Sequence, residues 1–279
     1  MRILVTGGSS VVGDYLLPRL AAQGHEVTVL SRRARSEPGW RRVDAAREPV
    51  WDDSLSGTEA LINLAPLPLL SRVLPGAPAK LKRVVAIGTT SVYTKDGSSS
   101  AKDRELVRQQ RAAEQGLFDA CAARGIRYTL FRPTLVYDGM RDKNIARIAR
   151  IIRRFGFFPV AAPGTGLRQP LHADDLAAAC VAALGAQDSR SYELAGGERL
   201  TYRAMLERIF QSLGRKPHIL PLPVGVYRAA ISAARVLPRY RTLTPAVAER
   251  MNQDMVFDSS AAARDFGLTP RGFAPGVPA

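Results

Sequence analysis

The chain has 279 residues, a formal net charge of +15 and an apolar fraction of 46%. This length fits one large domain or a core domain with a small appendage. No apolar run approaches the ~20 residues that span a bilayer. No secretory signal precedes the first predicted strand, so we expect a cytoplasmic protein without a membrane-spanning segment. Cys121 and Cys180 lie in predicted helices without metal-ligand spacing, which predicts buried thiols, a reducing compartment and no metal site.

The positive charge comes mainly from arginine spread through most of the chain. An anionic partner such as nucleic acid, a membrane surface or a phosphorylated ligand would explain it. The alternative is a solvated surface in an arginine-rich proteome, and we favour this alternative. No stretch resembles a recognition helix, and aromatic residues are not interleaved with the basic ones. We therefore expect no nucleic-acid partner.

The first part of the chain has the pattern of a nucleotide-binding strand, turn and helix. An apolar run from Arg2 to Thr6 is followed by a Gly-rich turn and by an apolar-periodic stretch to Ala22, with a second strand at Glu26 to Leu30. Gly7 can take the tight turn at positive φ, and Gly13 allows close helix packing. The N-terminus of the helix suits a pyrophosphate. An ordinary strand, turn and helix without a ligand is the less favoured alternative.

Two features of this stretch bear on the cofactor. Ser10 stands where the fingerprint has its middle glycine, and its hydroxyl can still bond a phosphate. Arg32 and Arg33 follow the second strand, where an acidic residue would favour NAD through the ribose. Arginine there can pair with a 2′-phosphate. We therefore predict NADP(H), with NAD possible and a solvated basic turn as the alternative.

Strand and helix patterns alternate along most of the chain, which predicts an α/β doubly wound parallel sheet of the Rossmann type. We expect a Rossmann domain over residues 1–215, with substrate-region segments from about 140 on. Residues 216–279 are expected to form a smaller, mainly helical lid, because Pro221, Pro223, Pro238 and Pro245 divide them into short helices. Arg271–Ala279 is expected to be a loose tail. Further strands are predicted at Arg41–Asp44, Ala60–Ala65, Arg83–Ile87, Arg127–Phe131, Leu167–His172 and Ser191–Leu194, and further helices at Asp103–Ala123, Asn144–Phe155, Ala173–Leu184 and Thr201–Leu213.

Several motifs follow one another in an order that resembles a known family. They are Thr6–Gly13, Asn63–Ala65, Ile87–Tyr93, Phe131–Gly139 and Leu171–Asp175. In this order they resemble the extended or atypical short-chain dehydrogenases/reductases of the NAD-dependent epimerase/dehydratase type, over nearly the whole chain. The resemblance implies that Thr89 takes the place of the catalytic serine and that Asp44 contacts adenine. The cofactor-binding residues that it implies, together with those above, are Gly7, Ser9, Ser10, Val11, Val12, Gly13, Arg32, Arg33, Asp44, Asn63, Leu64, Ala65, Arg111 and Pro133.

One family motif is absent, because no tyrosine in the chain is followed four residues later by lysine. When Arg111-Ala-Ala-Glu114 is aligned with the family's continuation, Arg111 takes the lysine position and Val107 the tyrosine position. The tyrosine is the family's general acid/base, and valine has no proton to give. Arginine keeps the charge and can bond the ribose, but it does not readily deprotonate. The resemblance thus implies that cofactor binding survives and standard catalysis does not.

Three side chains remain as candidates for handling a proton. Thr89 can orient a substrate carbonyl or bond its own backbone. Tyr93 and Tyr137 stand near strand ends, where open parallel sheets place ligands, although packing is the favoured role for each. His172 precedes a predicted helix and is expected to cap it.

Two classes of function remain. The favoured one is an NADP(H)-dependent oxidoreductase or epimerase acting on a small or nucleotide-linked carbonyl or hydroxyl substrate. The other is a non-catalytic protein that binds NADP(H) as a structural, accessory or redox-sensing component. The resemblance offers the Rossmann-type accessory subunit of complex I and negative transcriptional regulators as models. We expect a monomer or homodimer.

The stretch from Val224 to Arg241 allows two readings. It carries apolar residues together with Arg228, Arg235, Arg239 and Arg241. A basic amphipathic helix can lie on an anionic membrane, so peripheral membrane contact is possible. A lid helix packed on the Rossmann core is favoured, because the family uses this region to close over substrate. The favoured reading predicts a soluble protein.

Overall fold

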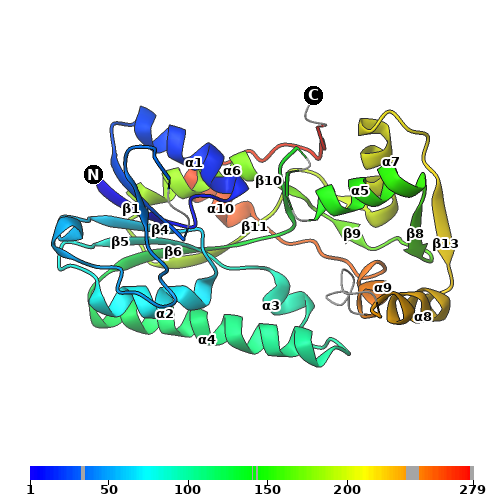
Figure 1. The fold of residues 1–279 in the computed structure, drawn as a ribbon, viewed down its shortest axis with the longest axis horizontal. Coiled ribbons are helices and arrows are strands. Elements are labelled where there is room, and N and C mark those ends of the chain that lie inside the picture. Colours follow the sequence, from blue (N-terminus) through cyan, green and yellow to red (C-terminus); the bar gives the residue numbers. More distant parts are fainter. Residues whose placement is uncertain (33–34, 140, 143, 237–244, 277–279) are drawn as a thin grey trace.

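The computed structural model describes residues 1–32, 35–139, 141–142, 144–236 and 245–276. Its centre is a parallel sheet of seven strands in the order β11-β6-β5-β4-β1-β2-β3 (Figure 1). The chain begins in the middle of the sheet, fills one side and then crosses to the other. This is the predicted doubly wound α/β fold. The strands are β1 Arg2–Thr6, β2 Glu26–Ser31, β3 Trp40–Arg42, β4 Ala60–Asn63, β5 Arg83–Ile87, β6 Arg127–Pro133 and β11 Arg190–Leu194.

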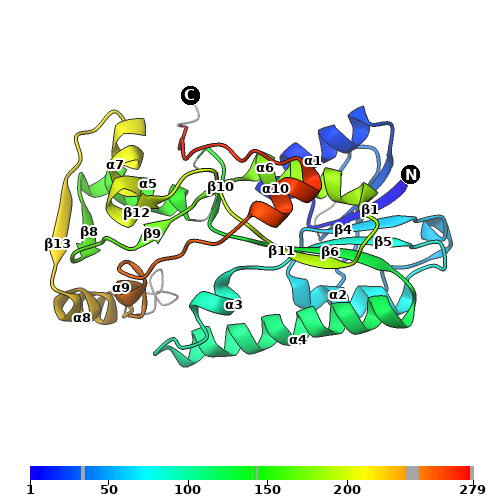
Figure 2. The same cartoon turned by 180° about the vertical axis from the view of Figure 1, so that it is seen from behind.

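Helices cover both faces of this sheet (Figures 1 and 2). On one face lie α1 (Val11–Ala22), α6 (Ala173–Ala182) and α10 (Ser260–Phe266); on the other lie α2 (Leu70–Val73) and α4 (Ala101–Ala123). Strand residues alternate between the two layers, as the pleat requires. In β1, Ile3 and Val5 pack in the α1 layer and Leu4 in the α4 layer. The sheet is therefore buried on both sides, as expected for βαβ units.

A second lobe lies beyond the carboxyl ends of the strands (Figure 1). It has its own buried cluster, which includes Ile148, Ile152, Leu206 and Phe210. Short strands β7 (Val136–Tyr137) and β10 (Leu171–His172) pair where the chain passes between the lobes. The elements of the second lobe are α5 Ile145–Phe155, β8 Phe158–Ala161, β9 Leu167–Arg168, β12 Leu200–Thr201, α7 Tyr202–Ser212, β13 Ile219–Leu222, α8 Val224–Ala234 and α9 Val247–Arg250.

Several predicted elements differ from the observed ones. The single strand predicted at Leu167–His172 is two short strands, β9 and β10, which pair with different partners. Strands β8 and β13 pair in parallel and were not predicted, because each contains a proline that hides the strand pattern. Strand β6 continues through Pro133, where the prediction ended it at Phe131.

The C-terminal region also differs from the prediction. Helix α10 returns to the sheet, where Ala262 is buried in the α1 layer, so residues 216–279 do not pack as one unit. The prediction of a loose tail is wrong for residues 271–276. Phe273 is 3% exposed in the core of the second lobe, and Arg271 pairs with Asp174 and Asp175 of α6. This segment therefore ties the two lobes together.

The predicted lid helix is α8, and it does not lie on the Rossmann core. It packs on β8 and α9 within the second lobe. Tyr227 is the one side chain buried in α8 itself. Arg239 and Arg241, which the prediction included, lie outside the described residues. No helix among the described residues is long and apolar enough to cross a membrane.

Candidate functional site: the carboxyl edge of the sheet

The predicted cofactor residues follow the carboxyl ends of neighbouring strands. In sheet order these ends are Ser31 of β2, Thr6 of β1, Asn63 of β4, Ile87 of β5 and Pro133 of β6. The order of strands reverses between β1 and β4, and open parallel sheets bind ligands at such a switch point. The topology therefore places the Gly-rich turn, Arg32, Asn63 and Thr89 along one edge. The Asp44 carboxylate lies beyond β3, where it accepts from the Ala46 amide.

The glycine turn has the geometry that the sequence predicted. Gly7 has a φ of +70°, and a Cβ there would stand 2.5 Å from the Ala65 amide nitrogen. A Cβ on Gly13 would stand 1.9 Å from the Gly8 carbonyl oxygen. Both positions require glycine, since the opposing atoms are backbone. The turn between β1 and α1 is thus held close to the end of β4 and leaves a shallow backbone cradle.

Helix α1 begins at this cradle and carries its own cap. The Ser10 hydroxyl accepts from the Gly13 amide at 3.3 Å. Ser10 therefore acts as an N-cap, which is a use of its hydroxyl that the sequence did not predict. The amides of Val11 and Val12 belong to the first turn of α1, which has no acceptor within the helix. Amides in this position of a helix commonly bind anions.

A cavity lies at the carboxyl end of β2. It has a volume of about 510 Å³ and is lined by Ser9, Ser31, Arg32 and Arg35. Arg35 was missed by the sequence reasoning, although it is another arginine in the same basic turn. Its guanidinium lies 4.4 Å from the centre of the Trp40 ring. Arg33 lies outside the described residues.

The end of β4 is fixed by a buried side-chain amide. The Thr6 hydroxyl donates to Asn63 Oδ1 at 2.6 Å, and Asn63 Nδ2 donates to the Ala65 carbonyl at 3.0 Å. Asn63 is 1% exposed. The Leu64 amide donates to the Thr6 carbonyl, which continues the ladder between β1 and β4. Residues Asn63–Ala65 thus form the rigid wall that faces the glycine turn.

The end of β5 carries two threonines with different roles. The Thr90 hydroxyl is buried and donates to the Pro133 carbonyl at 3.1 Å. Thr89 is half-buried, and its hydroxyl accepts from the Ser91 amide at 3.1 Å. A hydroxyl that accepts one bond still has its own proton to donate. Thr89 therefore combines the predicted backbone contact with a free donor.

A charged network lies beside Tyr93. Arg132 makes two bonds to the Glu114 carboxylate, at 2.9 and 2.7 Å, and approaches Glu193 at 3.4 Å. The Tyr93 hydroxyl donates to Glu193 at 2.7 Å. Burial and this bond to Glu193 raise the pKa of Tyr93 to about 12. The phenolic proton is therefore held by a carboxylate, which makes Tyr93 a poor acid in this arrangement.

Tyr137 is packed, as favoured from the sequence, and the alternative in which it faces the cleft as a proton donor is wrong. Tyr137 is fully buried, with ring contacts to Phe273 and His172 at 4.9 and 5.1 Å. Its hydroxyl donates to the Gly272 carbonyl and accepts from the Ala274 amide, each at 3.2 Å. Tyr137 therefore anchors the C-terminal segment. His172 caps α6 as predicted, since its Nδ1 accepts from the Asp174 amide at 3.1 Å.

The two positions aligned with the family's tyrosine and lysine lie on α4. Val107 is 1% exposed and offers no polar atom. Arg111 donates to Asp96 at 2.8 Å and to the Val92 carbonyl at 3.3 Å, and its side chain is half-exposed. Its guanidinium therefore braces the loop after α3 (Ser91–Thr94). Neither side chain supplies a proton at this position.

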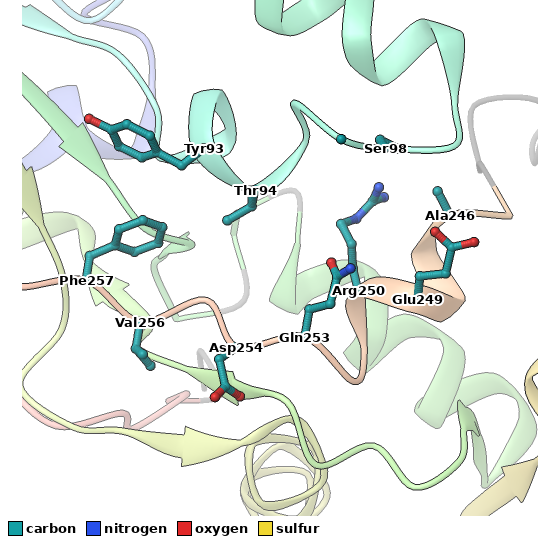
Figure 3. Close-up of a pocket in the computed structure, with 11 residues that line it drawn as sticks. Tyr93, Thr94, Ser98, Ala246, Glu249, Arg250, Gln253, Asp254, Val256 and Phe257 are labelled. Atoms are coloured by element: carbon teal, nitrogen blue, oxygen red, sulfur yellow. The ribbon is translucent and has the colours of Figure 1, made fainter.

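A cavity of about 490 Å³ opens between α3 and α9 (Figure 3). Tyr93 and Phe257 form its aromatic wall, with ring centres 5.9 Å apart. Glu249, Arg250 and Asp254 supply charged groups from the second lobe. The sequence reasoning identified Tyr93 alone of these residues, because the others come from a region without a recognisable motif. The cavity joins both lobes and has room for a small molecule.

An ion pair beside this cavity connects the lobes. Arg250 donates to the Asp103 carboxylate at 2.7 Å, and Lys95 lies 3.7 Å from the same group. Burial alone would raise the pKa of Asp103, but the charges of Arg250 and Lys95 and the bond from Arg250 lower it overall. The charge of Arg250 is therefore already compensated.

Comparison with known proteins agrees with this geometry. The family model described as NAD dependent epimerase/dehydratase family matches residues 3–69 and 45–195. A mitochondrial NADH dehydrogenase (ubiquinone) 1 alpha subcomplex subunit 9 from Arabidopsis thaliana is 25% identical over 251 residues. That match covers 81% of this chain and 61% of the relative's length, so the chain spans less than two thirds of that protein.

Two solved structures share the fold. MoeE5 in complex with UDP-glucose and NAD has a TM-score of 0.74 at 18% identity, covering 98% of this chain and 94% of that one. Human epimerase family protein SDR39U1 with NADPH has a TM-score of 0.67 at 21% identity, covering 97% and 95%. Both proteins therefore have the same overall fold as this chain. Because the family model matches most of the chain, this protein belongs to the NAD-dependent epimerase/dehydratase family.

Proposed function

We propose that the chain binds a nicotinamide dinucleotide along the carboxyl edge of its sheet, with its pyrophosphate at the N-terminus of α1. The observation that carries this proposal is the glycine turn, where Cβ atoms on Gly7 and Gly13 would collide with backbone. Because glycine has no side chain, such a turn leaves its backbone amides accessible to an anion. The structural relatives crystallised with NAD or NADPH support the same class of cofactor.

We further propose that NADP(H) is preferred over NAD(H). The cavity at the end of β2 carries Arg32 and Arg35 beside Ser9 and Ser31, and these side chains suit a 2′-phosphate. Asp44, the acidic residue that the family resemblance assigns to adenine, lies beyond β3 and is bonded to its own turn. A charge-assisted bond contributes about 1.5–3 kcal/mol, so NADPH should bind about tenfold or more tightly than NADH.

Titration of both nucleotides by intrinsic fluorescence tests this preference. The Arg32→Ala/Arg35→Ala variant should lose it while keeping NADH affinity. The control is Lys80→Ala/Lys82→Ala, which removes the same charge from exposed positions before β5. Equal affinities in the wild type, or an unchanged preference in the arginine variant, would refute the preference for NADP(H).

We propose that the chemistry is reduction of an activated small molecule. When bound, the nicotinamide would supply a hydride to an electrophilic carbon. Thr89 would donate a hydrogen bond to the oxygen or nitrogen that gains charge, and water would deliver the proton. This assignment follows from the residues on α4, since Val107 cannot give a proton and Arg111 is tied to Asp96. A positioned acid/base typically contributes 10²–10⁴-fold, so unactivated ketones and sugar nucleotides should be poor substrates.

Oxidation of NADPH against a panel of carbonyl and enone compounds tests the reaction. Thr89→Ala should lower turnover of an accepted substrate, while Tyr93→Phe should have a smaller effect because its proton is held by Glu193. Activity unchanged in Thr89→Ala would remove Thr89 from the reaction.

The second candidate is a non-catalytic accessory or redox-sensing protein that holds NADP(H). The missing proton donor on α4 favours it, as does similarity to a protein named as a subunit of NADH dehydrogenase. Tight NADPH binding without turnover on any member of the panel would select this candidate. A cytoplasmic location stays a prediction, because that relative is named as mitochondrial.

A further inference from the structure

The outer end of the second lobe combines exposed apolar side chains with positive charge. Among the described residues, six large hydrophobic side chains are exposed, and four of them are Phe155, Leu220, Val226 and Val236. They come from the end of α5, from β13 and from α8 with the residues just after it. These elements lie at the end of the molecule away from the sheet (Figures 1 and 2). Contiguous exposed apolar surface on a monomer commonly marks an interaction site.

Ring contacts and the chain itself link α5 to α8. The Phe155 ring lies 6.2 Å from the Phe157 ring, and Phe157 lies 6.0 Å from His218, just before β13. Strand β13 runs through Pro223 directly into α8. In α8, Tyr227 is buried while Val226, Ala229, Ala230 and Ala233 are exposed. We call the surface formed by Phe155, Leu220, Val226 and Val236 with the exposed cations Arg154, Lys216 and Arg235 the distal face.

The charge of this lobe is one-sided in the sequence itself. No aspartate or glutamate occurs between Asp142 and Asp174 or between Glu207 and Glu249. These two acid-free runs contain α5, β8, β9, β13, α8 and the start of α9. Other basic side chains pair with carboxylates, as Arg19 does with Asp174 and Arg2 with Glu26. A third acid-free run, residues 60–95, belongs to the lobe that contains the sheet. The helices and strand that form the distal face therefore carry positive charge and contain no carboxylate to offset it.

We propose that the distal face docks the protein on an anionic phospholipid surface. Aliphatic side chains on a short helix, with arginine and lysine beside them, match a helix that lies in the headgroup plane. Basic residues near an anionic leaflet are attracted by about 1 kcal/mol each. A nucleic acid would use the cations equally, but it would gain nothing from exposed valine and leucine. The inference does not depend on the proposed function, since the carboxyl edge is formed by the other lobe.

Co-sedimentation of the full chain with vesicles tests this proposal. We expect binding to vesicles of phosphatidylcholine mixed with phosphatidylglycerol, loss of binding as salt is raised, and little binding to phosphatidylcholine alone. Lys216→Gln/Arg235→Gln should weaken binding by about thirty-fold, from two cations near the surface. Val226→Ser/Val236→Ser should weaken it by about tenfold, because the buried apolar area is lost.

A matched control separates the distal face from net charge. Lys80→Gln/Lys82→Gln removes the same charge from the opposite end of the sheet and should bind vesicles as the wild type does. Circular dichroism and thermal unfolding check that every variant is folded. Absence of binding to anionic vesicles overturns the proposal, as does an equal loss in the control. Binding of duplex DNA as tight as vesicle binding, and unchanged by Val226→Ser/Val236→Ser, overturns it in favour of a polyanion site.

Discussion

The carboxyl edge of the sheet keeps the family's glycine turn, whereas α4 lacks the family's tyrosine and lysine. At the edge, Gly7 and Gly13 hold backbone contacts that no other residue allows. On α4, the positions aligned with the family's tyrosine and lysine are a buried valine and an arginine tied to Asp96. Binding a dinucleotide depends on backbone shape, whereas proton transfer depends on particular side chains. A chain can therefore lose the second while the first remains intact.

The largest expected effect concerns the network that supports this edge. Glu114→Ala removes both close bonds to the largely buried guanidinium of Arg132, which keeps its 3.4 Å contact with Glu193, and should destabilise the fold by about 3 kcal/mol. Denaturant unfolding of wild type and variant measures this loss. Glu105→Ala, which removes an exposed carboxylate on the same helix, should change stability little. Similar losses in both variants would mean that the Glu114–Arg132 pair is not a principal support.

The next effect tests the glycine turn. Gly7→Ala places a Cβ at positive φ against the Ala65 backbone and should destabilise by at least about 2 kcal/mol, with weakened NADPH binding. Gly116→Ala is the control, since the nearest atom to its added Cβ is 4.0 Å away in the middle of α4. It should stabilise by about 0.5–1 kcal/mol. Thermal unfolding of both variants gives the two signs. A harmless Gly7→Ala would show that the turn tolerates a side chain.

The smallest effect is a dependence on pH at the junction between the lobes. The folded pKa of Asp103 is lowered, so its contribution is present above the unfolded pKa of about 3.9 and is lost as pH falls through the folded value. Asp103→Asn should therefore be less stable than wild type at neutral pH, with the difference shrinking under acid. Melting temperatures of the pair across this range measure it. A difference that is constant with pH would contradict the assigned charge interaction with Arg250.

The sequence predicted the elements that carry strong local patterns. The first strand, turn and helix, the alternation along the sheet and the helix at Thr201–Leu213 (α7) are confirmed, because glycine, β-branched runs and apolar periodicity act locally. The parts missed depend on long-range contacts. Strands β8 and β13 contain prolines and pair only with each other, and the Glu114–Arg132–Glu193 network joins α4, β6 and β11.

Long-range contacts also decide the surroundings of the two candidate tyrosines. Tyr137 belongs to the family-like motif Phe131–Gly139, which begins in β6. Phe273, which is distant in the sequence, packs over Tyr137 and buries it. Nothing in the local pattern of the last residues predicts that contact. Likewise, the cavity between α3 and α9 unites Tyr93 with residues more than 150 positions later, which share no spacing with it. The sequence thus showed that these tyrosines lie near strand ends, but it did not show which distant residues pack against them.

The most direct test of this account is a titration of NADPH into the wild type and into Gly13→Val. We expect saturable binding in the wild type and its loss in the variant, because a side chain at position 13 would collide with the Gly8 carbonyl. Circular dichroism would show that the variant keeps its helices. Absence of NADPH and NADH binding in the wild type, or undiminished binding in a folded Gly13→Val protein, would contradict the claim that this edge is a working dinucleotide site.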